Sequence, residues 1–506
     1  MTIATAKRPC GDGPCPTPII TPAHSSSVST VVTPEGTPIN ARPVVGCTSI
    51  RKKILRGMPV SRLLRAGVKL EETSKYALPC DGLDAFISHA WMSPWWLKRL
   101  TLLLQFYCKS ALVVSCFSAA VLFVFDVAGF LPTVHVPTSV NFPGKINISS
   151  NFAVDVSPWS SAPIVLSLIM LFLGPELCGG QRDKSVFFDM ACISQDDEEL
   201  RSEGIASLAG FLDKSKELVV LWSPDNLTRT WCVFELAVYS ALADNGRRKI
   251  TWCPLHFYGI MVVIYLASGL AFFLFMVSLI VQVPNGKYAA LSAILAALSF
   301  ITAMAFHWGR MFMREKHGLL TDVAKFEVEH TKCAVASDKE FIKQSIEHWY
   351  GNESNFNDYV RGPMAATIDR ALGGIEGSYR LCLMATTANL WLEFSFVAAY
   401  MRAGAPWDAI ASQVLWALSK GFCMLPVWLK LALIVMDMRR HKQTTKAADM
   451  ALSLLLAIVW SMTLYCTSLL GTVARDSGLV MSLAWFAFFT FLSYIVFAVF
   501  SPSHNA

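Results

Sequence analysis

Long apolar runs separated by charged segments dominate the hydropathy pattern of this chain. Roughly eight runs of about 17–25 residues are long enough to cross a bilayer as helices. They lie at residues 109–131, 159–177, 257–282, 288–308, 381–401, 412–436, 450–471 and 482–501. The last six form three pairs, within 257–308, 381–436 and 450–501. The pattern therefore predicts a multi-pass α-helical membrane protein with about eight transmembrane helices.

A second pattern consists of short apolar stretches that end in polar residues. It predicts four strands, which begin at Asp84, Ser185, Glu217 and Lys249. Because each stretch is apolar throughout rather than alternating, we expect a parallel sheet covered by helices. The resulting α/β domain occupies 84–108 and 180–254, and a transmembrane hairpin formed by 109–131 and 159–177 is inserted into it. The fourth strand meets the third span almost at once, which leaves little chain for a fifth.

The remaining segments are more polar. Residues 1–50 are rich in Pro, Thr, Ser and Gly and lack an apolar signal-peptide core, so we expect a disordered N-terminal tail. Residues 51–83 are predicted to be a basic linker with one short helix. Residues 310–380 are predicted to be a partly helical cytosolic segment that docks on the α/β domain or on itself. Two loops complete the chain, a basic cytosolic one at 437–449 and one on the outer side at 132–158.

Composition and charge indicate membrane insertion and predict which segments lie on the cytosolic side. Hydrophobic residues make up 54% of the 506 residues and charged residues only 16%, which is typical of an integral membrane protein. Basic residues cluster in alternate loops, and the four segments on the other side carry one each, Lys145, Lys287, Arg402 and Arg475. The positive-inside rule then places both termini and the α/β domain in the cytosol. It does not distinguish the plasma membrane from an internal membrane.

Charge and cysteine content exclude several classes of partner and site. The net charge of +6 is modest and no long basic run occurs, so nucleic acid is not an expected partner. None of the 14 cysteines lies in a predicted outside loop, and no pair has zinc spacing, so we expect neither disulfides nor a metal site. Asn147 begins a glycosylation sequon that fits its outside position.

Glu235 is the most distinctive polar residue of the predicted α/β domain. It is the only charged residue between Arg229 and Asp244, on an otherwise apolar helix. Such a carboxylate lies either at the rim of a pocket or on a narrow solvated stripe. In a pocket, desolvation would raise its pKa and suit it to acid–base chemistry or to stabilising a cation. Trp231 lies one turn earlier on the same face and is a candidate for stacking on a ligand ring.

Four further candidates follow the first two strands: Ser88, His89, Trp91 and Asp189. In open α/β sheets, ligands bind beyond the carboxyl ends of the strands, which makes these residues candidate ligand contacts. His89 could donate to a ribose or a phosphate, and Asp189 could accept from a ribose hydroxyl. The alternatives are that Ser88 and His89 cap the following helix and that Asp189 orients its own loop.

Other charges have both a structural and a functional interpretation. The acidic run from Asp196 to Glu199 precedes a helix, whose dipole favours acids there, and it is also a candidate contact surface between domains. Within the predicted spans, Glu393 and Lys420 are expected to pair across neighbouring helices. Two more ionisable residues of the spans, Asp126 and Lys430, are predicted to lie near span ends.

The motifs of the α/β domain resemble those of the TIR (Toll/interleukin-1 receptor) domain family. Asp84–His89 looks like its opening strand and Val186–Asp189 like its second strand with an acidic end. Val219–Pro224 resembles the third strand and loop, and Arg229–Leu236 is similar to the Trp-Cys-x-x-Glu-Leu helix. The resemblance implies a flavodoxin-like sheet, although the membrane insertion and the missing last strand and helix depart from the family. The whole layout is similar to multi-pass TIR-like membrane proteins of algae and other protists.

The resemblance also implies two activities. Some TIR domains self-associate or recruit other TIR domains, and others cleave the glycosidic bond of NAD with a glutamate that corresponds to Glu235. In that case Trp231 would stack on nicotinamide or adenine, and NAD would be a substrate, with no cofactor. We therefore expect a membrane-anchored signalling protein that acts by self-association, with NAD hydrolysis as an output. The alternatives are a catalytically inactive scaffold and a transporter or channel regulated by the domain.

Overall fold

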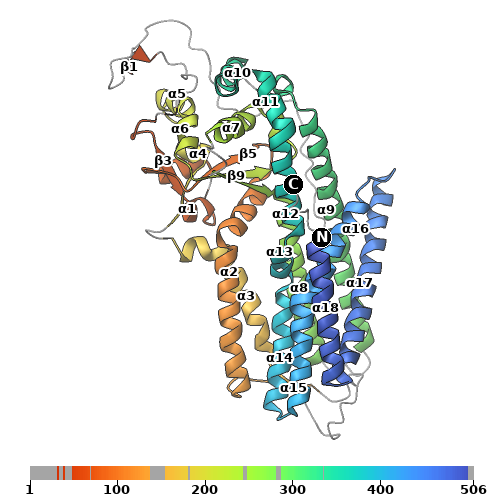
Figure 1. The fold of residues 1–506 in the computed structure, drawn as a ribbon. Coiled ribbons are helices and arrows are strands. Elements are labelled where there is room, and N and C mark those ends of the chain that lie inside the picture. Colours follow the sequence, from red (N-terminus) through yellow and green to blue (C-terminus); the bar gives the residue numbers. More distant parts are fainter. Residues whose placement is uncertain are drawn as a thin grey trace, which may run out of the picture.

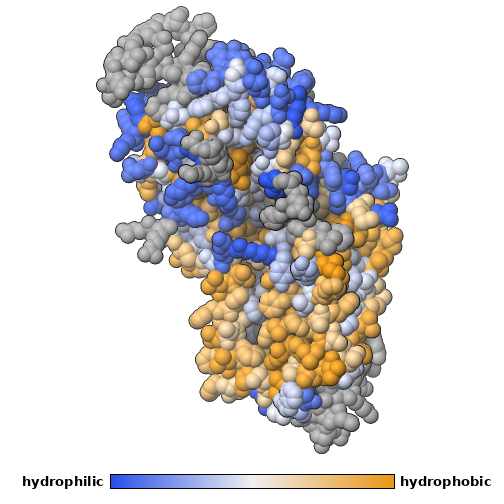
Figure 2. All heavy atoms as spheres, in the orientation of Figure 1, coloured by the Kyte–Doolittle hydropathy of each residue, from blue (hydrophilic) through white to orange (hydrophobic). Residues whose placement is uncertain are grey.

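The computed structural model describes residues 31–32, 38–39, 48, 50–68, 70–136, 154–179, 183–242, 248–280, 287–333 and 336–499. Most of the predicted tail, 1–50, and most of the loop 132–158, including Asn147, lie outside these residues. Figure 1 shows two parts, a small sheet with short helices and a bundle of long helices below it. In Figure 2, hydrophilic residues gather over the first part, and apolar residues form a broad band over the second.

A six-stranded sheet forms the centre of the α/β part. Its strands are β3 (Arg56–Pro59), β4 (Leu78–Pro79), β5 (Ala85–His89), β8 (Ser185–Phe187), β9 (Glu217–Trp222) and β10 (Lys249–Pro254). Their order is β10-β9-β5-β8-β3-β4. The strands β8, β5, β9 and β10 pair in parallel, and β3 is antiparallel to both of its neighbours. The four predicted strands are therefore present and form a parallel sheet.

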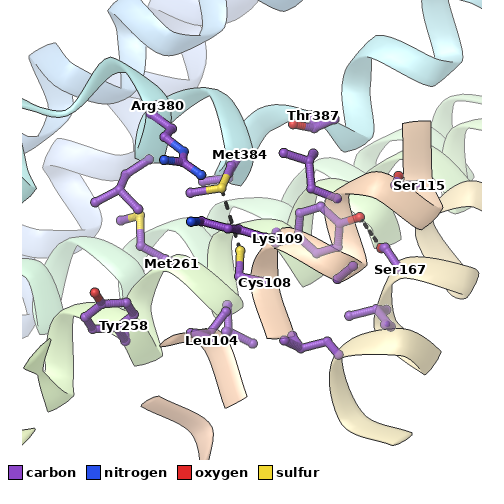
Figure 3. Close-up of a pocket in the computed structure, with 18 of the residues that line it drawn as sticks. Leu104, Cys108, Lys109, Ser115, Ser167, Tyr258, Met261, Arg380, Met384 and Thr387 are labelled. Carbon is purple, nitrogen blue, oxygen red and sulfur yellow. Dashed lines mark hydrogen bonds between the residues drawn. The ribbon is translucent and has the colours of Figure 1, made fainter. Parts of the chain in front are cut away.

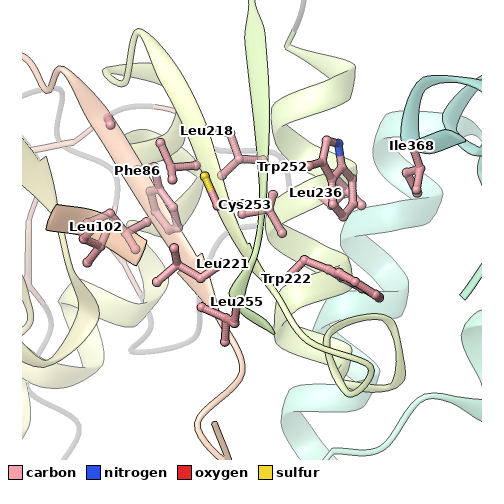
Figure 4. Packing of buried hydrophobic residues seen from close by; sticks show 14 of the residues in the cluster. Phe86, Leu102, Leu218, Leu221, Trp222, Leu236, Trp252, Cys253, Leu255 and Ile368 are labelled. Carbon is pink, nitrogen blue, oxygen red and sulfur yellow. The ribbon is translucent and has the colours of Figure 1, made fainter. Parts of the chain in front are cut away.

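The central strands are apolar throughout because both of their faces are covered. All five residues of β5 are buried, and the Phe86 ring stacks on Phe187 of β8 with centroids 4.4 Å apart. Figure 4 shows Phe86 and Leu102 on one side of the cluster and Trp222 and Trp252 on the other. Burying one such side chain contributes about 1.5–3 kcal/mol, so the covered faces of the sheet stabilise this part.

The segment 51–83 is part of the sheet rather than the predicted linker. Its strand β3 pairs with β8, and β4 pairs with β3. The short helix α1 (Val60–Leu64) and a 3-10 helix (Leu70–Tyr76) follow β3. Met58 and Leu64 are fully buried. The apolar residues of this segment are few and are interrupted by basic ones, so its sequence shows no strand period. The strand β3 forms because the open edge of β8 offers it a partner.

The sheet ends at β10 within the described residues, and helices from later in the chain cover that edge. The helix α12 (Ala365–Gly377) packs against β10, and Figure 4 shows its Ile368 on the side of Trp252. Trp222 of β9 meets Phe312 of α9 (Lys287–Ala324) with ring centroids 6.2 Å apart. Both predicted alternatives for 310–380 are observed, because the segment docks on the α/β domain and also packs on itself, with the Phe326 and Phe356 rings 6.0 Å apart.

Helices lie in all eight predicted apolar runs. They are α2 (Trp95–Val127), α3 (Ala162–Leu177), α8 (Leu255–Ile280), α9, α13 (Tyr379–Thr386) with α14 (Ala388–Arg402), α15 (Trp407–Leu418) with α16 (Leu425–Met438), α17 (Lys446–Asp476) and α18 (Leu479–Val499). Among the described residues, four helices are long and apolar enough to cross a membrane, namely α2, the continuous Trp407–Met438, α17 and α18. The bent pair α13–α14 would make a fifth. These helices indicate membrane association, and a total of eight spans stays a prediction.

The helix after the first strand runs directly into the first span, and the two form one helix, α2. Two details of the bundle differ from the sequence pattern. The helix α2 ends before the predicted 131 because Gly129 takes a φ of 77°. The fifth run is bent by 58° between α13 and α14. At the bend, the Thr387 hydroxyl donates to the Leu383 carbonyl at 2.7 Å, and such back-bonding bends helices.

Ion pairs join the helices of the bundle. Lys420 Nζ lies 2.6 Å from Glu393 Oε1, which confirms the predicted pairing. Asp126 Oδ1 lies 2.6 Å from Arg402 Nη1, so the carboxylate predicted near a span end has a basic partner on α14. Lys430 is buried, at 5% exposed. In the two ion pairs, the opposite charge offsets the cost of removing each charge from water.

Candidate functional site

The predicted site residues meet where β5 and β8 end. In the strand order, β5 and β8 are neighbours, and the chain leaves β5 through α2 and leaves β8 through the short helix α4 (Asp189–Cys192). Ser88 and His89 are the last residues of β5, and Asp189 follows β8. Because parallel strands end at the same edge, their polar termini are brought together although roughly a hundred residues separate them in the chain.

Asp189 organises this edge of the sheet. Its Oδ2 accepts a hydrogen bond from Trp91 Nε1 at 2.9 Å, and its Oδ1 lies 3.9 Å from His89 Nε2. The Oδ1 atom also accepts from the Met190 backbone at 2.7 Å, which is the loop-orienting role predicted as the alternative. The His89 ring stacks on Phe188 with centroids 4.9 Å apart. These contacts hold the imidazole and the indole on either side of one carboxylate.

His89 is held as a neutral imidazole. Its side chain is buried, and this burial lowers its pKa more than the nearby Asp189 carboxylate raises it. The ammonium of Lys98, also buried, lowers the pKa of His89 further. A neutral imidazole has one donor and one acceptor nitrogen, so His89 is able to bind a hydroxyl from either side.

Glu235, on α7 (Thr230–Ala241), lies at the same edge of the sheet. Its Oε2 atom is buried and has no hydrogen-bond partner among the described residues. Burial raises the pKa of Glu235 to about 8, the Ser88 hydroxyl lowers it through a hydrogen bond, and the Asp189 charge raises it. The side chain thus lies at a pocket rather than on a solvated stripe. At neutral pH this carboxyl is mostly protonated until a positive charge arrives beside it.

A cavity of about 140 Å³ joins these groups. The predicted residues that line it are His89, Trp91, Asp189, Trp231 and Glu235. Ser88 is not part of the lining and acts on it through Glu235. Pockets for drug-sized ligands measure about 300–1,000 Å³, so this cavity has room for one ring of a ligand and not for a whole dinucleotide.

Trp231 is oriented by the segment that the sequence assigned only a docking role. The ring of Trp231 meets Phe234 edge-on at 5.6 Å, and a hydrogen bond links it to Asp338 of α10 (Ala336–Tyr350). Asp338, Lys332 and Cys333 all line the cavity, and none of them was predicted. Nothing in their local sequence marks them, because they reach the site only through tertiary docking.

A backbone bridge fixes this docking. The Lys332 amide donates to the Thr228 carbonyl at 2.7 Å, and the Thr230 amide donates to the Lys332 carbonyl at 3.2 Å. Arg229 therefore lies beside Lys332, and both line the cavity together with Arg201. Arg201 binds Glu198, and its Nε atom has no partner among the described residues. Three basic side chains in the lining favour a ligand with an anionic extension.

No family model, curated protein or solved structure matches the chain. Within the described residues, no group of three or more His, Cys, Asp or Glu side chains could hold a metal ion. The edge offers a buried carboxyl, a neutral imidazole and aromatic rings beside basic side chains.

The raised pKa of Glu235 makes the stability of the protein depend on pH. The folded protein keeps this carboxyl protonated up to about pH 8, whereas the unfolded chain ionises near its ordinary value of 4.5. The folded state thus binds more protons across this window, and stability is lost as the pH rises through it. Glu235→Gln removes the titration. We expect the free energy of unfolding of this variant to equal that of the wild type at pH 5 and to exceed it at pH 9 by about 2–4 kcal/mol, at roughly 1.4 kcal/mol per pKa unit after allowing for partial exposure. Its unfolding temperature should therefore be higher than that of the wild type at pH 9 and equal at pH 5. Equal unfolding temperatures at pH 9 would contradict the burial of this carboxyl.

Proposed function

We propose that the protein is a multi-pass membrane protein with eight transmembrane helices, which displays a split TIR-like domain in the cytosol. The domain hydrolyses the bond between nicotinamide and ribose in NAD, and it signals through self-association. The strand order supports the TIR-like assignment. Numbered along the chain, the four parallel strands lie in the order 2-1-3-4, as do the first four strands of the flavodoxin-like order 2-1-3-4-5. The bundle anchors this domain with both termini on its side of the bilayer.

The observation that carries the proposal is the buried, unpartnered carboxyl oxygen of Glu235 in the cavity beyond β5 and β8. Ligands of open α/β sheets bind beyond the carboxyl ends of the strands, where this cavity lies. In the order 2-1-3-4 the connections diverge between β5 and β9, and α7, which carries Glu235, follows β9. A buried group with an unused acceptor needs a ligand that supplies a positive charge or a donor. The nicotinamide end of NAD is a flat ring with a positive charge, and it matches both the cavity and the carboxyl.

The chemistry follows from these contacts. The bond between the ribose C1′ and the pyridinium nitrogen breaks, and its electron pair leaves with neutral nicotinamide. The positive charge that develops on the ribose is stabilised by the Glu235 carboxylate, as carboxylates do in glycoside hydrolysis. Water then attacks C1′ and loses one proton, which Glu235 accepts and passes to solvent. The products are nicotinamide, ADP-ribose and one proton.

The remaining residues position the dinucleotide. The His89 imidazole and the Asp189 carboxylate are placed to bind the ribose hydroxyls, and Trp91 or Trp231 offers a ring for the nicotinamide. The cavity has room for the nicotinamide ring only, so the diphosphate of NAD would lie outside it. It would be held there by Arg201, Arg229 and Lys332. Each of these residues lines the one cavity that contains Glu235.

The test is nicotinamide release from NAD by purified full-length protein in lipid nanodiscs. We expect nicotinamide and ADP-ribose in equal amounts, with a rate per molecule that rises with protein concentration if self-association completes the site. A folded, monodisperse protein that releases no nicotinamide at any concentration would contradict the hydrolase. The small cavity would then favour the alternative of a catalytically inactive scaffold.

Self-association has its own test at the acidic run before α5 (Glu198–Ala206). Asp197 caps this helix by accepting from the Glu199 and Leu200 amides at 3.0 Å, and Glu198 pairs with Arg201, so both have structural roles. Asp196 and Glu199 are exposed and form no ion pair among the described residues. We expect the double change Asp196→Lys, Glu199→Lys to weaken self-association at least about tenfold in sedimentation experiments, because like charges would face each other.

The matched control reverses two exposed acids elsewhere on the same part, Asp225→Lys with Glu347→Lys. It should leave the sedimentation profile unchanged. If both double variants behave as the wild type does, the contact surface lies elsewhere.

A further inference from the structure

A second cavity lies in the bundle, between α2, α3, α8 and α13 (Figure 3). Its volume is about 350 Å³, and most of its lining is apolar, including Leu104, Leu168, Met261 and Met384. Three polar side chains of its wall already have hydrogen-bond partners. Ser167 and Tyr265 share a hydrogen bond of 2.6 Å, and Ser115 Oγ accepts from Trp391 Nε1 at 3.0 Å. The free surface of the cavity therefore suits a hydrocarbon chain.

Two cations belong to the lining of this cavity. Lys109 of α2 and Arg380 of α13 both line it, and Figure 3 shows their charged ends pointing into the region beside Met384. Both side chains are exposed, and neither forms an ion pair with a described residue. The lining contains no acidic residue. A pair of cations in the lining of an apolar cavity matches an amphiphile with an anionic head.

The depth of the two cations identifies the leaflet. Lys109 is the first residue of the predicted run 109–131, and Arg380 directly precedes 381–401. In the predicted topology both lie at the cytosolic ends of their spans, at the level of lipid phosphates. Basic pockets between helices on this side of a membrane bind anionic headgroups.

We propose that this cavity binds an anionic phospholipid of the cytosolic leaflet, with its phosphate between Lys109 and Arg380 and one acyl chain inside the cavity. This inference rests on the proposed membrane insertion and is independent of NAD hydrolysis. A third cavity, of about 510 Å³, provides an internal contrast. Its only charged lining residue is Asp126, which is paired with Arg402, so it offers a lipid chain no selection for a headgroup.

The experiment uses full-length protein reconstituted with phosphatidylcholine alone or with 10% phosphatidylserine, extracted into mild detergent and analysed by native mass spectrometry. We expect one phosphatidylserine to be retained in preference to phosphatidylcholine by at least tenfold. The double variant Lys109→Gln, Arg380→Gln should lose this preference. The control Lys442→Gln, Lys446→Gln removes two exposed cations of the predicted cytosolic loop and should keep it.

Two further experiments test whether the acyl chain, and not only the anionic headgroup, is needed for binding. Ala385→Phe fills the cavity while both cations remain, and it should also abolish retention. The water-soluble headgroup glycerophosphoserine should not displace the bound lipid, because it lacks the chain. Equal retention of both lipids by the wild type, or unchanged selectivity in both cavity variants, would overturn the proposal. Displacement by glycerophosphoserine would overturn the role of the acyl chain and indicate a site for a soluble anion.

Discussion

Glu235→Gln is expected to lower kcat for nicotinamide release at least about 100-fold, with little change in KM. Glutamine keeps the shape of the side chain and is able to accept the hydrogen bond from Ser88. It lacks the negative charge that would face the developing cation, and removing one such electrostatic contact costs about 10²–10³ in rate. An effect on kcat rather than on KM separates a contact made in the transition state from simple binding of NAD.

The matched control is Glu340→Gln on α10. Glu340 is exposed and outside the cavity lining, and its carboxylate contacts only Gln344 among the described residues. Its activity should stay within a few fold of the wild type. Full activity in Glu235→Gln would show that the buried carboxyl is structural, and the proposed role of Glu235 would be wrong.

Arg310→Ala is expected to lower the free energy of unfolding by about 3–5 kcal/mol. Arg310 is 0% exposed, and its guanidinium makes five hydrogen bonds. Their acceptors are the carbonyls of Arg439, His441 and Asp449, the Asp449 carboxylate and the Ser453 hydroxyl. The side chain thus joins the loop between α16 and α17 to α9, and alanine would remove all five of these hydrogen bonds, three of them to the buried residues Asp449 and Ser453.

Thermal unfolding in detergent measures this loss. Lys216→Ala is the control, because Lys216 forms an equally short ion pair with Asp84, at 2.8 Å, but is 77% exposed. Exposed pairs contribute about 0–1 kcal/mol, so its unfolding temperature should barely change. Arg314 also contacts Asp449, at 3.3 Å, and retains part of the pairing in Arg310→Ala. If the two variants unfold at the same temperature, the buried network adds no stability.

The sheet was predictable because its central strands carry their own signal. β5, β8, β9 and β10 are apolar on both faces, and this pattern survives the insertion of two membrane helices between β5 and β8. The strands β3 and β4 were missed, since their few apolar residues acquire a partner only at the open edge of β8. The bend between α13 and α14 was missed for a related reason, because it depends on side-chain hydrogen bonds to the backbone and not on hydropathy.

The candidate site, too, was predictable only in part. Residues that follow strands, or that break an apolar helix face, were predicted and lie together: His89, Trp91, Asp189 and Glu235. Lys332 and Asp338 were missed because they belong to a segment that reaches the cavity by docking on α7. The acidic start of α5 has the capping role that its position favours, through Asp197. The sedimentation experiment tests whether its neighbours Asp196 and Glu199 form a contact between domains.

The measurement that tests the central claim most directly is the pH profile of kcat/KM for nicotinamide release by the wild-type protein. The claim is that Glu235 must be ionised to act and that burial holds its pKa at about 8 in the free protein. We expect kcat/KM to rise about tenfold per pH unit between pH 6 and 7.5 and to level off above pH 8, since this parameter reports groups of the free enzyme. A profile that is flat, or that falls, between pH 6 and pH 9 would contradict the account.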